Sequence, residues 1–188
     1  MGIAPQLDRV TVELGEARRR AHAMTAPLTD EQWRTCPARN EWSVAECLIH
    51  LNLTSRAFLP RIREAINRGR ELGLGSTGRY RRDIVGWFVY WLTEPPVRFR
   101  IKTTAPFVPA GIEPRDRVLA TFDTLQEQLV ACVSEADGLA LGRLRIVSPF
   151  DSRLKYNLYS CLTIIPAHQR HHLAQAERVL ESLRAFSS

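Results

Sequence analysis

The sequence has no Cys-x-x-Cys pair and no long apolar run. Every apolar stretch is interrupted by a charged residue or a proline well before 18 residues, which argues against a membrane span. The four cysteines lie too far apart for a zinc cluster, so we expect buried thiols rather than disulfides. They are Cys36, Cys47, Cys132 and Cys161. The first residues lack the basic-then-apolar pattern of a secretory signal, and we expect a cytoplasmic protein with no membrane partner.

Lysine is scarce, and arginine supplies almost all of the net charge of +6, with Lys102 and Lys155 as the only lysines. Arginines concentrate between Arg56 and Arg82, where no nucleic-acid motif accompanies them. We therefore assign them to solvated helix faces and expect no nucleic-acid partner. The 188 residues are 45% apolar and 24% charged, an ordinary globular composition. We expect one domain spanning residues 1–188.

Apolar residues recur with the helical period in four long segments. These lie at about residues 6–24, 43–69, 114–136 and 157–185. Ser43 and Glu46 have the spacing of a capping box, and Asn157 is a second expected N-cap. The predicted fold class is all-α, a four-helix bundle with long connections.

Two shorter helices and several connections complete the expected chain. The short helices are predicted at about residues 28–33 and 84–92, and the second should be buried because it is apolar and aromatic. Residues 73–78, 97–112 and 139–153 are expected to connect helices, and we predict no strand, although Arg143–Val147 has a weak strand pattern. The tryptophans are assigned to the core and not to a cofactor cage. They are Trp33, Trp42, Trp87 and Trp91.

The histidines carry most of the functional signal. On the last helix, His172 falls within the apolar stripe and His168, four residues earlier, lies at its edge, so both should face the bundle interior. His171 points further out, and His22 is assigned to the surface at the end of the first helix. His50 lies on the flank of the apolar stripe of the second long helix.

Buried imidazoles are costly without partners, because each must place an N–H and a lone pair. A divalent ion would accept the lone pairs, and the i, i+4 spacing lets two helical histidines reach one ion. Gln169 stands where a zinc protease helix needs glutamate, which excludes that chemistry. If the second and last helices are neighbours, His50 can be a third ligand beside His168 and His172. Three histidines leave an open coordination position, the catalytic arrangement.

Other interpretations remain open at this stage. The histidines can be core residues satisfied by hydrogen bonds, and a thiolate ligand from Cys47 or Cys161 is a further alternative. Glu46 can orient a ligand or act as a base, although capping is the simpler role.

Two segments resemble the DinB-like superfamily. Residues 40–51, NEWSVAECLIHL, resemble its second-helix signature, in which a Trp-Ser pair opens a helix that carries a ligand histidine. Residues 168–179, HQRHHLAQAERV, resemble its last-helix signature, His-x-x-x-His followed by Gln. The resemblance implies a bundle in up-down-down-up order. It also implies a divalent metal, zinc or nickel, on His50, His168 and His172, and frequent homodimers.

The leading functional prediction is a metal-dependent enzyme acting on a small-molecule substrate. The ion would lower the pKa of water or a thiol and so produce a nucleophile near neutral pH. The resemblance implies either a transferase or isomerase that depends on a low-molecular-weight thiol, or a hydrolase. The alternative is a non-catalytic bundle that binds a metal or another ligand. The three histidines are assigned as metal ligands only, and the sequence identifies no catalytic or substrate-binding residue.

Overall fold

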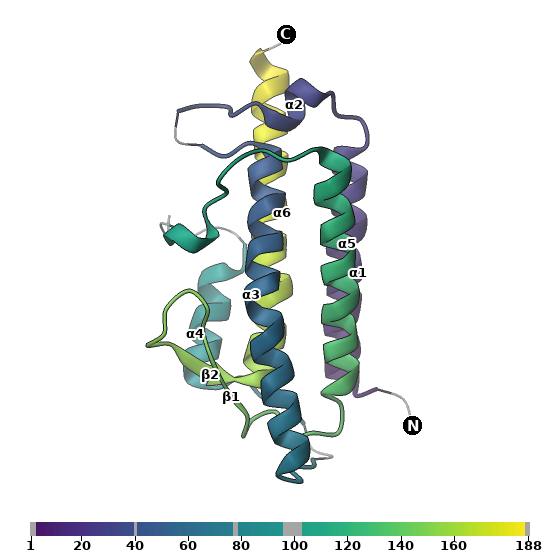
Figure 1. Cartoon of the computed structure of the whole chain (residues 1–188), viewed down its shortest axis with the longest axis vertical. Coiled ribbons are helices and arrows are strands. Elements are labelled where there is room, and N and C mark those ends of the chain that lie inside the picture. Colours follow the sequence, from purple (N-terminus) through teal and green to yellow (C-terminus); the bar gives the residue numbers. More distant parts are fainter. Residues whose placement is uncertain (1–2, 40, 77–78, 96–102, 187–188) are drawn as a thin grey trace.

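A computed structural model describes residues 3–39, 41–76, 79–95 and 103–186, and four long helices dominate it (Figure 1). The long helices are α1 (Pro5–Thr25), α3 (Val44–Glu71), α5 (Arg115–Glu135) and α6 (Leu158–Phe186). The shorter elements are α2 (Asp30–Arg34), α4 (Ile84–Thr93), the 3-10 helix η1 (Ala105–Phe107), β1 (Arg145–Val147) and β2 (Lys155–Asn157). All six helices predicted from periodicity are present.

The four long helices run up, down, down and up in chain order (Figure 1). This order requires a long connection between α3 and α5, which run in the same direction, and that connection contains α4 and η1. Helix α3 packs against both α5 and α6, and α1 packs against the same two helices. The predicted four-helix bundle is therefore confirmed. No helix in the described part of the chain has the length and apolarity needed to cross a membrane.

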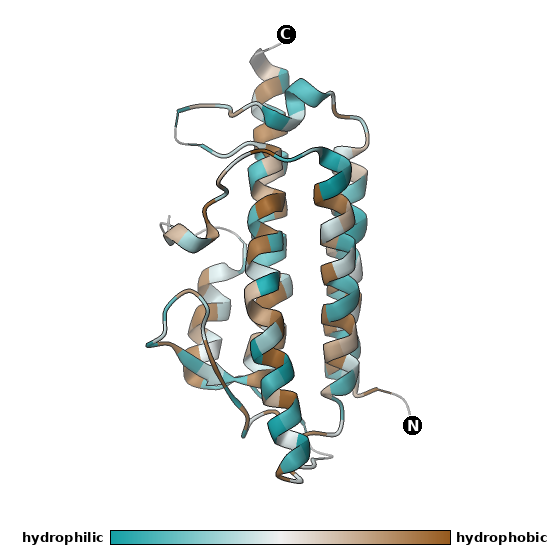
Figure 2. Cartoon of the chain, viewed as in Figure 1, coloured by the Kyte–Doolittle hydropathy of each residue, from teal (hydrophilic) through white to brown (hydrophobic). Residues whose placement is uncertain are grey.

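The core consists of the inward stripes that the helical period indicates. On α1 the whole predicted stripe is buried: Leu7, Val10, Leu14, Ala17 and Ala21. Figure 2 shows hydrophobic and hydrophilic residues alternating along each long helix, as expected for helices with one face in the core and one in water. Buried residues divide into two clusters, one at each end of the bundle, and the second contains Trp33 and Cys47.

Two predicted helix starts fix how α3 and α6 enter the bundle. The Ser43 hydroxyl accepts from the Glu46 backbone N–H, and the Glu46 carboxylate accepts from the Ser43 N–H at 2.8 Å. This is the expected capping box. At the start of α6, the Asn157 side chain accepts from the Ser160 N–H at 2.8 Å. Each cap is a hydrogen bond between residues three positions apart. The local sequence therefore determines where each histidine-bearing helix begins.

Three sequence predictions were wrong. Helix α4 is not buried, because Gly86 is its one buried residue and Trp87 and Phe88 lie exposed. Gly86 faces the bundle, and Tyr90 is only partly buried against the core. The connection before α6 contains an antiparallel hairpin, β1 with β2, which is too short for a periodic signal. Cys36 is exposed, whereas the other three thiols are buried as expected. The predictions for residues 40, 77–78 and 97–102 lie outside the described residues.

Candidate metal centre

Helices α3 and α6 bring three imidazoles together inside the bundle. His50 comes from α3, and His168 and His172 come from successive turns of α6. Their ring centroids are 5.1 Å apart for His50 and His168, 4.4 Å for His50 and His172, and 4.6 Å for the α6 pair. One ring nitrogen from each can be chosen so that all three lie within 4.8 Å of one another. We call these residues the histidine cluster.

Hydrogen bonds fix which nitrogen of two of the rings is free. His50 Nδ1 lies 2.7 Å from the Phe107 carbonyl, and His172 Nδ1 lies 2.9 Å from Gln175 Oε1. A carbonyl oxygen can only accept, so each Nδ1 carries the proton and donates it. In the neutral rings, Nε2 of His50 and Nε2 of His172 are therefore left with a lone pair. This is the tautomer that a metal-binding histidine needs, with its N–H held by an acceptor.

The spacing of the free nitrogens suits a shared ion. His50 Nε2 and His168 Nε2 are 3.3 Å apart. Two nitrogens bound at about 2.1 Å to one tetrahedral ion lie about 3.4 Å apart. In the described part of the chain, no carboxylate or thiol joins the three histidines in this group. An ion here would therefore have three protein ligands and an open position.

Burial keeps the histidine cluster neutral. His50 and His172 are buried, and His168 is partly buried. Burial lowers the pKa of His50 to about 4, against the opposing effect of its hydrogen bond to Phe107. Burial, together with the neighbouring imidazoles, holds the pKa values of His168 and His172 well below the ordinary value. At neutral pH the three lone pairs are therefore available without loss of a proton.

Aromatic side chains from outside the long helical stripes flank the histidine cluster. The Trp42 ring stacks on His172 with centroids 5.8 Å apart and contacts His50 at 4.9 Å. On another side, Phe150 contacts His168 at 5.6 Å, and Phe107 contacts Phe150 at 4.9 Å. These neighbours make the surroundings of the cluster apolar. The sequence analysis placed Trp42 in the core. It did not assign Phe107 or Phe150 to the site, because connecting segments have no repeating apolar pattern that would show which way a side chain points.

Gln169 and Arg170, which follow His168 on α6, point away from the cluster. The Gln169 amide exchanges hydrogen bonds with Gln126 of α5, at 2.9 and 3.1 Å. Arg170 donates to Glu13 of α1 at 2.9 Å and to Glu94 beyond α4 at 3.0 Å. Gln169 thus has a packing role on the opposite side of the helix, which agrees with the exclusion of zinc protease chemistry.

Other predicted candidates lie elsewhere. His22 Nε2 lies 2.9 Å from Asp123 at the surface, as expected. His171 is not simply solvent-facing: its ring centroid is 4.8 Å from that of His172, and burial lowers its pKa, against the opposing effect of a hydrogen bond that the ring donates to the Thr93 backbone. Glu46 serves the capping box. Cys47 and Cys161 lie in the two core clusters, outside the histidine group.

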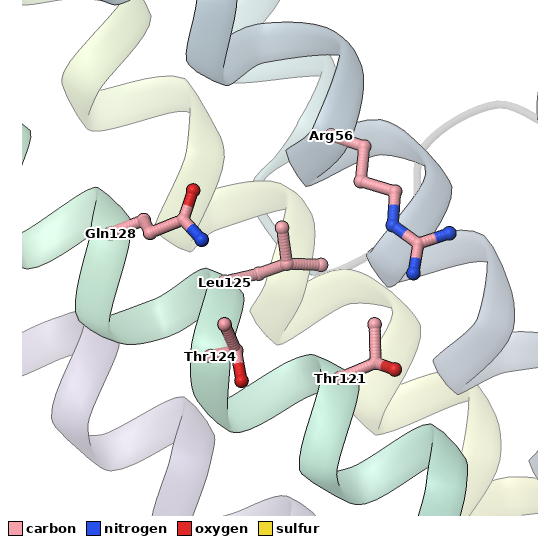
Figure 3. Close-up of a pocket in the computed structure, with 5 residues that line it drawn as sticks. All are labelled: Arg56, Thr121, Thr124, Leu125 and Gln128. Atoms are coloured by element: carbon pink, nitrogen blue, oxygen red, sulfur yellow. The ribbon is translucent and has the colours of Figure 1, made fainter.

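The basic stretch contributes to a separate shallow groove between α3 and α5. Its lining residues are Arg56, Thr121, Thr124, Leu125 and Gln128 (Figure 3). None of them belongs to the histidine cluster. The groove carries one arginine and no buried charge, so it adds no chemistry to the metal centre.

Comparisons with known proteins agree with this architecture. The sequence profile of the DinB superfamily matches residues 13–176. YfiT from Bacillus subtilis has a similar structure, with a TM-score of 0.64 and 16% sequence identity over 97% of this chain and 90% of that one. YfiT is described as a probable metal-dependent hydrolase with an unusual four-helix bundle topology. At this identity the likeness shows the fold. A search of curated proteins gave no match.

Proposed function

The chain belongs to the DinB superfamily, and from this membership and the site geometry we propose that it is a metal-dependent enzyme. His50, His168 and His172 are the proposed ligands of one divalent ion, zinc or nickel. The observation that carries the proposal is the convergence of three neutral imidazoles, two of which have their Nδ1–H groups already held by acceptors. Core histidines that each had their own hydrogen-bond partners would have no need to bring their ring nitrogens together at one point.

The residues present fit a catalytic ion better than a structural one. Structural sites surround zinc with four protein ligands, whereas catalytic sites keep one position open. The described residues offer three nitrogens and no fourth ligand group. A divalent ion bound there supplies Lewis acidity, which lowers the pKa of water or a thiol and gives a nucleophile near neutral pH.

The protein's own side chains orient and shield the site. Phe107 and Gln175 fix the His50 and His172 rings through their Nδ1–H groups. Trp42 and Phe150 pack on the His172 and His168 rings, so an ion held by the cluster would have apolar surroundings. We propose a small-molecule substrate with an apolar group near its reacting bond. The attacking group is a low-molecular-weight thiol, in a transferase or isomerase, or water, in a hydrolase.

The description of YfiT as a probable metal-dependent hydrolase supports the second of these reactions. Membership of the family supports the proposal of a bound metal ion. Whether water or a thiol is the attacking group can be decided by measuring turnover with and without added thiol. A hydrolase turns over without added thiol, and a transferase does not. A cytoplasmic location and a homodimer remain proposals of the same kind, drawn from the sequence and the family.

The test begins with metal content. Protein without an affinity tag is stripped with chelator, reloaded with zinc or nickel, and analysed by elemental mass spectrometry. We expect about one ion per chain and its loss in a His50→Ala, His168→Ala, His172→Ala variant. His22→Ala is the matched control, because it removes an imidazole outside the cluster. Failure of the wild-type chain to retain either ion after reloading would refute the metal-dependent function.

A non-catalytic metal-binding bundle is the second candidate. The observation in its favour is the close packing of Trp42 and Phe150 on the ligand rings, which would also suit a closed site. A cobalt-substituted protein separates the two candidates. Its visible spectrum should change when a small thiol or azide is added if a coordination position is open, and should stay constant if none is.

A further inference from the structure

Helix α4 presents large apolar side chains to solvent. Ile84 is 87% exposed, Trp87 56% and Phe88 50%. Their spacing places the three on one face of the helix, and we call them the α4 face. No residue from Ile84 to Thr93 is charged, and Figure 2 shows no strongly hydrophilic colour along α4. A continuous apolar face of this kind marks an interaction site more often than a chance exposure.

The opposite side of α4 is firmly attached to the bundle. A Cβ added to Gly86 would lie 2.1 Å from Ser160 Oγ on α6, so the two helices approach as closely as glycine permits. Asp83 caps α4 by accepting from Gly86 N at 2.9 Å and also accepts from the Ser160 hydroxyl at 3.2 Å. The α4 face is therefore presented on a fixed helix, and α4 cannot turn it inward without breaking these contacts.

Three exposed cations near α4 are unpaired among the described residues, whereas the carboxylates there are paired. Arg79 and Arg81 are exposed just before the helix, and Lys155 is exposed on β2, which contacts α4. In the described part of the chain, none of these three cations forms an ion pair with a carboxylate. The nearby carboxylates are engaged: Asp83 with Arg145 and Glu94 with Arg170. The face is thus apolar and aromatic with a basic surround.

We propose that the α4 face is a docking surface for an anionic lipid bilayer. Tryptophan and phenylalanine are the side chains that enter the headgroup boundary, and arginine and lysine beside them attract anionic lipid. The expectation of no membrane partner rested on the lack of an apolar run long enough to span a bilayer, and a contact made by the α4 face needs no such run. The contact is peripheral, and it is independent of the histidine cluster and of the proposed enzyme function.

A second copy of the chain suits this face less well. Two half-exposed aromatics and one isoleucine offer roughly 300–400 Å² of apolar surface. A stable protein–protein interface buries about 800 Å² on each partner, of which little more than half is apolar, so the apolar area suits either occupant. A symmetric pair through this face would bring equal cations toward one another. Charge complementarity therefore favours an anionic bilayer.

The test is co-sedimentation of the purified full chain with vesicles, without metal. One set contains phosphatidylcholine alone, and the other contains phosphatidylcholine and phosphatidylglycerol. We expect binding to the anionic set, a blue shift of the tryptophan fluorescence that the Trp87→Ser, Phe88→Ser variant loses, and loss of both signals at high salt. Trp87→Ser with Phe88→Ser should weaken binding about tenfold or more. Arg79→Gln with Arg81→Gln should weaken it roughly fivefold per arginine.

Matched controls replace similar residues elsewhere on the surface. Val12→Ser with Leu72→Ser removes exposed apolar side chains, and Arg19→Gln with Arg56→Gln removes exposed cations. Both should bind like the wild-type chain, and circular dichroism checks that every variant is folded. Absence of wild-type binding to anionic vesicles, or equal binding by the Trp87→Ser, Phe88→Ser variant, overturns the proposal. A concentration-dependent dimer that this variant abolishes, without vesicle binding, would assign the face to a second copy instead.

Discussion

The hydrogen bond from His172 to Gln175 gives a graded test of the metal centre. Gln175 Oε1 accepts from His172 Nδ1 at 2.9 Å, and this contact holds the ring so that Nε2 faces the other two imidazoles. Gln175→Leu keeps a similar volume and removes the acceptor. Loss of such a supporting partner lowers metal affinity by about 10–100-fold, which is about 1.4–2.7 kcal/mol. Gln175 is only partly buried, so water can replace its oxygen, and we expect the lower end of that range.

Gln175→Glu should act in the opposite direction. A carboxylate acceptor makes the imidazole a stronger ligand, so zinc should bind at least as tightly as in the wild-type chain. Gln128→Leu is the control, because Gln128 lies on α5 in the groove away from the histidines. Dissociation constants come from titration against a chromophoric chelator. A Gln175→Leu constant within about twofold of the wild-type value, while the triple histidine variant binds nothing, would refute the orienting role.

Four further outcomes are expected. Gly86→Ala should destabilise the fold by about 1–3 kcal/mol in urea unfolding, because its Cβ would meet Ser160 at 2.1 Å; Ser160→Gly in the same chain should recover part of the loss. Under native conditions a thiol reagent should modify one cysteine rapidly, Cys36, because the other three are buried; fast reaction of two or more would contradict the packing. Arg170→Met should destabilise the fold by about 1–3 kcal/mol, because it removes the partly buried cation that joins Glu13 to Glu94 and leaves Glu13 with only the exposed Arg9 as ion-pair partner among the described residues. In metal-free protein the pKa of His50 is about 4, below the unfolded value of about 6.5. Stability should therefore fall as the pH drops from 6.5 toward 4, by about 2 kcal/mol at pH 5 from this residue alone. His50→Phe should remove about that part of the loss, whereas the part from the lowered pKa values of His168 and His172 stays.

The sequence predicts the long helices and the histidine cluster for the same physical reason. Helical periodicity states which residues share a face, and two helices whose apolar faces meet must bring the polar residues within those faces together. His172 lies inside such a stripe, and His50 lies at the edge of another. The capping box at Ser43 then sets where α3 begins, which fixes the turn on which His50 appears. These are local rules, and they suffice for the bundle and for the three imidazoles.

In a short helix, the spacing of apolar residues does not indicate which side is buried and which is exposed to solvent. Residues 84–93 contain no charge to mark an outer side, so their aromatics appeared to be core residues. The structure turns Gly86 inward, because a residue without a side chain permits the close approach to Ser160. The same limit applies to Phe107 and Phe150. They reach the histidine cluster from η1 and from the loop between the two strands, where no repeat indicates direction.

Contacts of one turn of α6 hold the histidine cluster in place without an ion. His168 and His172 face the cluster, Gln169 is held by α5 through Gln126, and Arg170 is held by α1 and by the residue after α4. The turn is therefore fixed on several sides by contacts that do not involve the metal. A ligand set on such a turn loses little conformational entropy when the ion binds. It follows that Gln126→Leu, which breaks a contact on the far side of the helix, should weaken zinc binding as well as folding stability. If it lowers stability but leaves the zinc dissociation constant unchanged, the geometry of the cluster depends on α3 and the flanking aromatics alone.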